Sequence, residues 1–287
     1  MSEIKQILED LGYKLKDFGS HFRAKPLYRD SGNETSLSIN KVTGGWYDFS
    51  INRGGEFNDL LKLMGKEGVE LQQQLNPSFY EEPLDVKTFS PEIVKSLSKQ
   101  YDYWVQRGVS EATVKEFGGG VDYQWKLKNR YVFPVYDGRN KIVGLFGRDL
   151  TGNPKVPKYK ILGKKKDFRW PLYLNHQIIQ DSKIVILTES PACILRLWDA
   201  GIKNAVCLFG TDISGSLIGL LIRYNLKKII IATNNEPDNA SIGNLAAKKI
   251  ERKLLEFFDP ANVIVKLPTK KDFAIMTNFE IEMWNKS

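Results

Sequence analysis

The chain has 287 residues, of which 42% are hydrophobic, and carries 42 Lys and Arg against 34 Asp and Glu for a net charge of +8. This length and composition exclude a disordered chain and allow one large domain or two to three small ones. No run approaches the roughly 20 apolar residues of a membrane span, and the start lacks the apolar core of a signal peptide, so we expect a cytoplasmic protein without a membrane partner.

The basic balance favours polyanionic partners such as nucleic acid. The two cysteines, Cys193 and Cys207, both lie inside apolar segments. This excludes a disulfide framework and a thiolate zinc site. His21 and His176 are far apart and belong to no metal-spaced motif, which favours structural or surface roles for both.

Residues 1–66 are predicted to form a small α+β module. An amphipathic helix opens it, because apolar residues recur at helical spacing from Ile4 onward. Two strands over 36–39 and 45–49 flank a turn and form a hairpin. A Gly-Gly pair then leads into a helix over 57–64.

Residues 67–92 are polar and rich in turn residues, which predicts a linker. Residues 93–181 are predicted to form a separate small subdomain. It begins with a helical piece over 91–106, followed by strands over 130–133 and 141–146 that an Asp-Gly turn joins.

This middle segment interleaves cations with aromatic side chains. The cations are Arg107, Arg130, Arg148, Lys155, Lys158, Lys160, the run 164–166 and Arg169, and the aromatic residues are Tyr123, Trp125, Tyr159 and Trp170. Cations mixed with aromatic rings suit phosphate contact together with base stacking. The alternative is a solvated basic face over ordinary core aromatics, and it is the favoured interpretation for any single lysine of the run 164–166.

Residues 182–287 alternate strand and helix. Apolar strands are predicted over 183–188, 205–209, 228–233 and 263–265, with helices between them. Consecutive strands joined by helices form a parallel sheet with both faces covered. The fold class is therefore α/β.

Acid and amide side chains follow two of these strands directly. Glu189 ends the first, and Asn234, Glu236 and Asp238 follow the strand over 228–233. Side chains just past the carboxyl ends of parallel strands converge on the crevice where such sheets bind ligands. Oxygen ligands gathered there, with few histidines in the chain, indicate a Mg²⁺ or Mn²⁺ site for phosphate chemistry.

Several short motifs, in their order along the chain, resemble the catalytic core of bacterial and phage replicative primases. The matching residues are 107–108, 130–137, 147–148, 157–159, 170–173, Glu189, 201–206, 210–211 and 243–247. The resemblance implies a TOPRIM-type parallel sheet flanked by helices over 182–287. It also implies that a small mixed basic subdomain and a zinc-ribbon-like N-terminal hairpin module precede this sheet.

The resemblance further implies a DNA primase that makes short RNA primers on single-stranded DNA from nucleoside triphosphates by Mg²⁺-dependent nucleotidyl transfer. A replicative helicase is the implied partner. The chain's size and the lack of a long carboxyl-terminal extension favour a phage enzyme acting in the host cytoplasm over a bacterial one. Glu189 would position the metal or act as a base, with Glu236 and Asp238 as further catalytic acids. The resemblance also implies that Arg148, Lys158 and Tyr159 line the nucleotide and template groove, with Arg130 and Arg169 as second-rank candidates for binding nucleotide or nucleic acid.

Two departures from the family pattern motivate an alternative. Cys193 and Asn234 stand where the family usually carries aspartates. Glu236 and Asp238 then supply a shifted Glu-x-Asp pair, and Asp272 is a further acid that approaches the site. The alternative is a catalytically degenerate TOPRIM replication factor that binds single-stranded DNA or a helicase without making primers.

Residues 25–57 resemble the family's amino-terminal zinc-binding domain in outline. The four positions of the zinc ligands carry Lys25, Tyr28, Asp48 and Ile51. Lysine and isoleucine do not ligate zinc under these conditions, so we expect a zinc-free module that its own hairpin and helix hold together.

Overall fold

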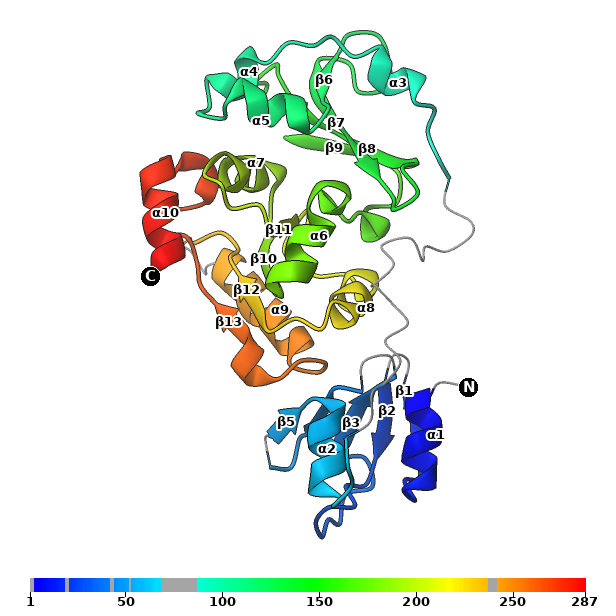
Figure 1. Cartoon of the computed structure of the whole chain (residues 1–287). Coiled ribbons are helices and arrows are strands. Elements are labelled where there is room, and N and C mark those ends of the chain that lie inside the picture. The colour runs from blue at the N-terminus through cyan, green and yellow to red at the C-terminus, as the bar shows by residue number, and fades with distance from the viewer. Residues whose placement is uncertain (1–2, 19–20, 42–43, 52, 69–86, 237–241) are drawn as a thin grey trace.

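The computed structural model describes residues 3–18, 21–41, 44–51, 53–68, 87–236 and 242–287. In Figure 1 the N-terminal module lies at one end, the parallel sheet with its helices in the middle, and the basic subdomain at the other end. No helix in the described ranges is both long and apolar enough to cross a membrane.

The N-terminal module is a five-stranded antiparallel sheet with two helices. Its elements are α1 (Glu3–Asp10), β1 (Lys16–Phe18), β2 (His21–Ala24), β3 (Leu37–Asn40), β4 (Trp46–Asp48), β5 (Arg53–Gly55) and α2 (Phe57–Leu63), with the strands in chain order across the sheet. The predicted hairpin is present as β3 and β4, with Ile39 opposite Trp46. Gly54 is needed in β5, because a Cβ there would lie 2.6 Å from the Trp46 carbonyl oxygen.

The basic subdomain carries a four-stranded antiparallel sheet in the order β6-β7-β8-β9. Its elements are α3 (Glu92–Lys95), α4 (Asp102–Val105), α5 (Glu111–Glu116), β6 (Gly120–Asp122), β7 (Arg130–Tyr136), β8 (Ile142–Asp149), β9 (Tyr159–Leu162) and the 3₁₀ helix η1 (Lys165–Asp167). The expectation of one helical piece over 91–106 is wrong. Ser98 and Val121 exchange two backbone hydrogen bonds of 2.9 and 2.8 Å, which divides the piece into α3 and α4.

Residues 172–236 and 242–287 form the α/β unit that was predicted over 182–287, and its four-stranded sheet is parallel throughout in the order β11-β10-β12-β13. Its elements are α6 (Leu172–Ser182), β10 (Ile184–Thr188), α7 (Pro191–Asp199), β11 (Ala205–Cys207), α8 (Gly215–Arg223), β12 (Lys228–Ile231), α9 (Ile242–Leu254), η2 (Pro260–Asn262), β13 (Val263–Val265), η3 (Phe273–Ile275) and α10 (Asn278–Lys286).

Alternate strand residues pack on opposite faces of this sheet, as strand geometry requires. Val185 and Leu187 pack with residues of α8 and α9, whereas Ile186 packs with residues of α7 and of the basic subdomain. The cluster around Ile186 is continuous across both parts of the chain. The parallel sheet and the basic subdomain therefore share one core.

Polar contacts also join these two parts. The buried Arg196 guanidinium of α7 donates to the carbonyl oxygens of Gly108 and Met276. Asp199, at the end of the same helix, accepts from the Ser110 backbone N–H at 3.0 Å and from the Thr113 hydroxyl at 2.9 Å. These bonds fix the basic subdomain against the helix that follows Glu189.

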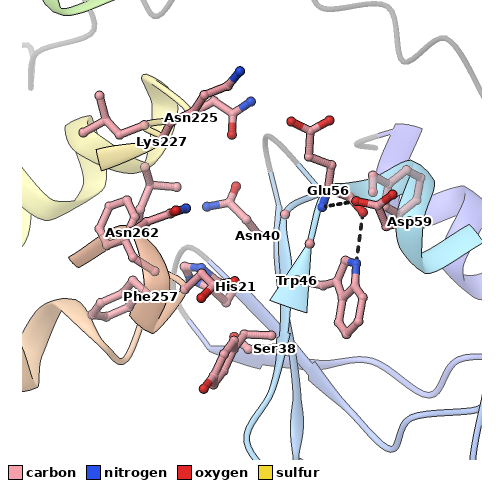
Figure 2. Close-up of a pocket in the computed structure, with 18 of the residues that line it drawn as sticks. His21, Ser38, Asn40, Trp46, Glu56, Asp59, Asn225, Lys227, Phe257 and Asn262 are labelled. Atoms are coloured by element: carbon pink, nitrogen blue, oxygen red, sulfur yellow. Dashed lines mark hydrogen bonds between the residues drawn. The ribbon is translucent and has the colours of Figure 1, made fainter. Parts of the chain in front are cut away.

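The N-terminal module meets the parallel sheet at its amino edge. The His21 ring lies 5.2 Å from the Phe257 ring, and a cavity of about 540 Å³ separates the two surfaces (Figure 2). Lys227 and Asn262, which line this cavity, directly precede β12 and β13. Glu189 follows the carboxyl end of β10, so it lies at the opposite edge of the sheet.

Candidate active site

The carboxyl edge of the parallel sheet brings the predicted acids together. Glu189 follows β10 directly, and its Oε1 accepts a hydrogen bond of 3.3 Å from the backbone N–H of Asn234, which lies just past β12. The sequence predicted this convergence from the ends of the two strands. At Asn234 it is the backbone N–H that contacts Glu189.

Three carboxylates share this edge. Burial raises the pKa of Glu189 above its ordinary value, and the nearby charges of Glu236 and Asp272 raise it further, while the Asn234 hydrogen bond opposes them. Asp272 is half-buried, and its Oδ1 has no hydrogen-bond partner among the described residues. Asp272 therefore belongs to the candidate site.

Tertiary hydrogen bonds bring Asp272 to this edge. The Asn235 backbone N–H donates to the Lys271 carbonyl at 2.8 Å, and its side chain donates to the Pro268 carbonyl at 3.0 Å. These bonds fasten the segment after β13 to the segment after β12. Asp272 then follows beside Glu189.

Glu236 has a different partner in this arrangement. Its carboxylate pairs with the Lys271 ammonium at 3.0 Å, and this contact raises the pKa of Lys271. The proposed partner acid, Asp238, lies outside the described residues. The shifted Glu-x-Asp pair therefore stays a prediction.

Cys193, at the position of a usual aspartate, is buried and accepts a hydrogen bond of 3.3 Å from the Ser190 hydroxyl. Burial raises the pKa of its thiol to about 11, so the group is neutral near pH 7. A neutral buried thiol does not replace a carboxylate at a Mg²⁺ ion.

The donor set fits a hard divalent cation by its chemistry. Glu189, Glu236 and Asp272 offer carboxylate oxygens, and the Asp272 Oδ1 has no hydrogen-bond partner in the described ranges. As they stand, no three His, Cys, Asp or Glu side chains in the described ranges form a group that could hold a metal ion. Glu236 is the acid that is not free to bind a cation in this arrangement, because its carboxylate is paired with the Lys271 ammonium.

A basic pocket of about 570 Å³ lies in the middle subdomain, lined among others by Tyr103, Arg107, Arg148, Lys155 and Lys158. The Arg148 Nε donates to the Tyr103 hydroxyl at 2.7 Å, and its guanidinium lies 5.3 Å from the centre of the Tyr159 ring. The Arg107 guanidinium stacks 3.8 Å above the Tyr103 ring. Arg148 and Lys158 therefore line one pocket, and the Tyr159 ring lies beside Arg148.

Tyr103 was not among the predicted site residues. Its spacing of four from Arg107 is a usable signal, because such a pair shares one face of a helical turn. The aromatic ring orders both arginines, one through its face and one through its hydroxyl.

Two of the basic residues that were predicted to bind nucleotide or nucleic acid lie outside the basic pocket. Arg130 is buried, and its Nη1 donates to the carbonyls of Gly147 and Pro157 at 3.1 and 2.9 Å. Arg169 lies near Tyr224, where its charge lowers a phenol pKa that burial raises. Neither lines the basic pocket. Arg130 instead holds the backbone of Pro157, next to Lys158.

Tyr159 connects the basic pocket with the carboxyl edge. Its ring lies 6.4 Å from the Phe146 ring, which lies 5.0 Å from the Phe209 ring in the loop after β11. The Gly210 N–H of this loop donates to the Glu189 carbonyl oxygen at 3.0 Å. The phosphate-binding candidates and the acids therefore border a common region of the molecule.

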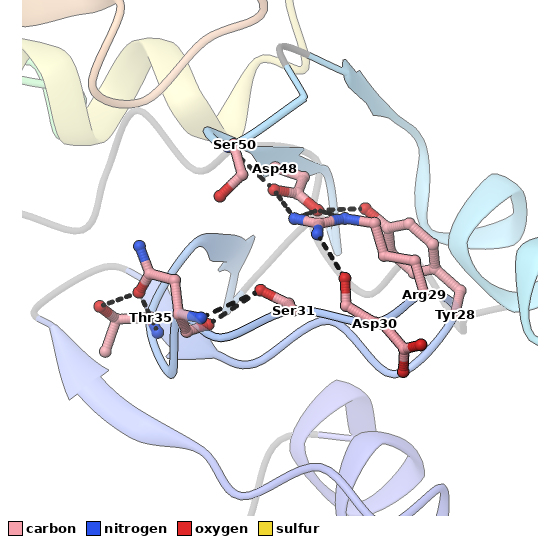
Figure 3. Close-up of polar contacts among 8 residues, drawn as sticks. Tyr28, Arg29, Asp30, Ser31, Thr35, Asp48 and Ser50 are labelled. Atoms are coloured by element: carbon pink, nitrogen blue, oxygen red, sulfur yellow. Dashed lines mark hydrogen bonds and ion pairs between the residues drawn. The ribbon is translucent and has the colours of Figure 1, made fainter.

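The N-terminal module has a compact polar cluster at two of the four zinc-ligand positions (Figure 3). The buried Asp48 carboxylate accepts from the Tyr28 hydroxyl at 2.7 Å and from the Arg29 Nε and Nη2 at 2.8 Å each. The Ser50 backbone N–H adds a bond of 3.0 Å. Lys25 and Ile51 are exposed.

No model of a known protein family matches the chain. The chain is 30% identical to a DNA primase of Campylobacter jejuni over 82% of its own length and 49% of that protein. It is 28% identical to a DNA primase of Borreliella burgdorferi over 62% of its own length and 39% of that protein. The chain thus spans about half or less of the length of these relatives.

Solved structures show the same fold. The zinc-binding and RNA polymerase domains of the Aquifex aeolicus primase match 99% of the chain and 82% of that structure, with a TM-score of 0.57 and 18% identity. A primase catalytic domain bound to single-stranded DNA matches 68% of the chain and 76% of that structure, with a TM-score of 0.56 and 19% identity. The chain is similar in sequence to bacterial DNA primases and has the fold of their TOPRIM-containing catalytic cores.

Proposed function

We propose that the chain is a DNA primase that joins nucleoside triphosphates into short RNA primers on single-stranded DNA, with Mg²⁺ or Mn²⁺. One observation carries this proposal. The acids around Glu189 and the basic pocket around Arg148 border a common region, through the ring contacts of Tyr159 with Phe146 and of Phe146 with Phe209 in the loop that hydrogen-bonds to Glu189. Nucleotidyl transfer needs both halves, because a cation-binding edge and a phosphate-binding surface must meet the same substrate.

The residues have distinct roles in this proposal. Arg148 and Lys158 bind phosphates of the template or of the nucleotide, and Tyr103 and Tyr159 hold the Arg148 guanidinium in place. Glu189, together with Asp272 and Glu236, would hold the cation, which supplies stabilisation of charge on the attacking and departing oxygens. The raised pKa of Glu189 also suits it to accept a proton from the attacking 3′ hydroxyl.

The test is primer synthesis on single-stranded template with nucleoside triphosphates and Mg²⁺, with a replicative helicase present or absent. Glu189→Gln keeps the shape of the side chain and removes its charge, so we expect a loss of roughly 10²- to 10⁴-fold in rate. The matched control is Glu282→Gln, an exposed position on α10. Equal synthesis by both variants would exclude Glu189 from the reaction.

The second candidate function is a TOPRIM replication factor that binds single-stranded DNA without making primers. The neutral Cys193 and the Lys271-paired Glu236 favour it, because both reduce the negative charge available to a cation. DNA binding without synthesis, under every metal and helicase condition, would establish this alternative.

Three finer expectations are part of the proposal. The helicase partner is tested by stimulation of synthesis, and the phage context stays an expectation from resemblance. The zinc-free module is supported by the hydrogen bonds that already saturate Asp48. Metal analysis of the purified protein tests it, with stoichiometric zinc as the contrary result.

A further inference from the structure

Lys165 differs from the other two lysines of the run 164–166 in the surface that its side chain contacts. The Lys165 ammonium lies against Gly210, where a Cβ would come within 3.0 Å of the Nζ atom. Gly210 has a φ of +145°, a conformation that a side chain would strain. The loop after β11 therefore has a bare surface directly beneath this ammonium.

The backbone that follows Lys165 is anchored at two points, which directs the side chain to this place. The Lys166 carbonyl oxygen accepts a hydrogen bond of 2.7 Å from the Ser216 hydroxyl near the start of α8. Phe168, which follows η1, is buried and packs its ring 5.4 Å from that of Phe209. The short 3₁₀ helix is thus fixed over the loop 208–211.

This loop belongs to the carboxyl edge. The Gly210 N–H donates to the Glu189 carbonyl oxygen at 3.0 Å. The pKa of the buried Cys207 thiol is raised by burial first, is lowered by the charge of Lys165 and is raised by that of Glu189, so both charges act on one atom at this edge. Lys165 approaches from the β11 side, and Asp272 and Glu236 lie on the β12 and β13 side.

The two lysines that border this edge differ in their partners. Lys271 pairs with Glu236, whereas the Lys165 ammonium makes no ion pair or hydrogen bond with any of the described residues. An exposed ammonium beside the edge that is proposed to hold the cation is suited to bind a polyphosphate, whose several negative charges exceed what one divalent ion neutralises.

We propose that Lys165 binds the phosphates of the incoming nucleoside triphosphate. The proposal rests on the proposed function and assigns a residue to its substrate. It selects one lysine from a run of three, and the two neighbours provide matched controls. Lys164 is exposed and Lys166 is held through its backbone, and neither side chain has a described contact with the carboxyl edge.

The experiment compares Lys165→Ala with Lys164→Ala in the full chain. We expect Lys165→Ala to weaken binding of a fluorescent ATP analogue with Mg²⁺ by roughly 10- to 100-fold, the effect of losing a charged hydrogen bond. The corresponding monophosphate should lose less, and Lys165→Arg should recover most of the affinity. Lys164→Ala should stay within about twofold. Unchanged thermal unfolding of each variant checks its fold.

Steady-state primer synthesis provides the second measurement, with Lys165→Ala raising the KM for nucleoside triphosphate. If the wild type binds ATP and makes no primers, the proposed function fails, and the affinity series alone decides the role of Lys165. Equal affinities for Lys165→Ala and Lys164→Ala would overturn the proposal. So would an equal loss for triphosphate and monophosphate, or a wild type that binds no nucleoside triphosphate.

Discussion

The Asp48 cluster of the N-terminal module and the carboxyl edge of the parallel sheet surround their acids in opposite ways. Asp48 is buried and receives hydrogen bonds from the Tyr28 hydroxyl, from two nitrogens of Arg29 and from the Ser50 N–H. At the carboxyl edge, within the part of the chain that the structure describes, Glu189 accepts one backbone hydrogen bond of 3.3 Å and the Asp272 Oδ1 accepts none.

This difference distinguishes a carboxylate that stabilises the fold from a carboxylate that is available to bind a cation. A carboxylate saturated by protein donors is stable where it lies and has few lone pairs left for a cation. Burial raises the pKa of Glu189 most, and repulsion from the charges of Glu236 and Asp272 raises it further. A bound cation would relieve this repulsion at the carboxyl edge, and it would have to displace Arg29 at Asp48.

The largest expected effect is on the Asp48 cluster. Asp48→Ala leaves the donors of Tyr28, Arg29 and Ser50 without their acceptor, so we expect the free energy of unfolding of the module to fall by about 2–4 kcal/mol. Urea denaturation measures it. The control is Asp30→Ala, because Arg29 contacts only the backbone oxygen of the exposed Asp30. If a zinc chelator destabilises the wild type as strongly as Asp48→Ala does, the cluster is not what holds the module.

The next effect concerns binding of DNA beside the carboxyl edge. Arg148→Ala should weaken binding of single-stranded DNA by roughly 10- to 100-fold and make the logarithmic salt dependence shallower by about 0.7. Fluorescence anisotropy at several salt concentrations measures both. Arg139→Ala, in the exposed turn between β7 and β8, is the control. A loss of affinity with an unchanged salt slope would exclude a phosphate contact for Arg148.

The sequence predicted the sheets better than the direction of side chains on them. The strands over 183–188 and 228–233 were readable because a short apolar run that ends in polar residues is typical of a buried parallel strand. Arg130 and Arg148 looked equivalent, but Arg148 pairs opposite Tyr131, so Arg130 points to the other face. A register shift of one residue reverses such an assignment, and the sequence alone does not determine it.

The strands β1, β2 and β5 and the place of Asp272 depend on tertiary contacts. Each of these strands has only three or four residues and includes charged or glycine positions, so its local pattern is weak. Asp272 reaches Glu189 because Asn235 hydrogen-bonds to the segment after β13. Residues that are so distant in sequence produce no periodic pattern from which their contact could be predicted.

A smaller effect is expected on stability at the carboxyl edge. Because the folded-state pKa of Glu189 is raised, the folded state binds its proton more readily than the unfolded chain, and stability falls as pH rises between the two pKa values. At pH 7 without metal, Glu189→Gln should therefore raise Tm by roughly 1–2 °C. The gain should shrink toward about pH 4, near the pKa of an unfolded glutamate.

Thermal unfolding over this pH range, with Glu282→Gln as the control, measures the effect. Mg²⁺ should stabilise the wild type more than Glu189→Gln, because a ligand stabilises the state that binds it. A loss of stability in Glu189→Gln at neutral pH would place Glu189 with Asp48, among the acids that hold the fold.

The smallest effect tests whether Lys271 competes with a cation for Glu236. Removing the ammonium frees a carboxylate at the edge, so Lys271→Ala should tighten Mn²⁺ binding by about two- to fivefold, as expected for an exposed ion pair. Calorimetric titration measures the affinity. The matched control is its neighbour, Lys270→Ala, which loses an ion pair to Glu280 instead. Weaker binding in Lys271→Ala would mean that the lysine holds Glu236 in position for the ion. The carboxyl edge would then resemble the Asp48 cluster, because a protein cation would orient the acid in both.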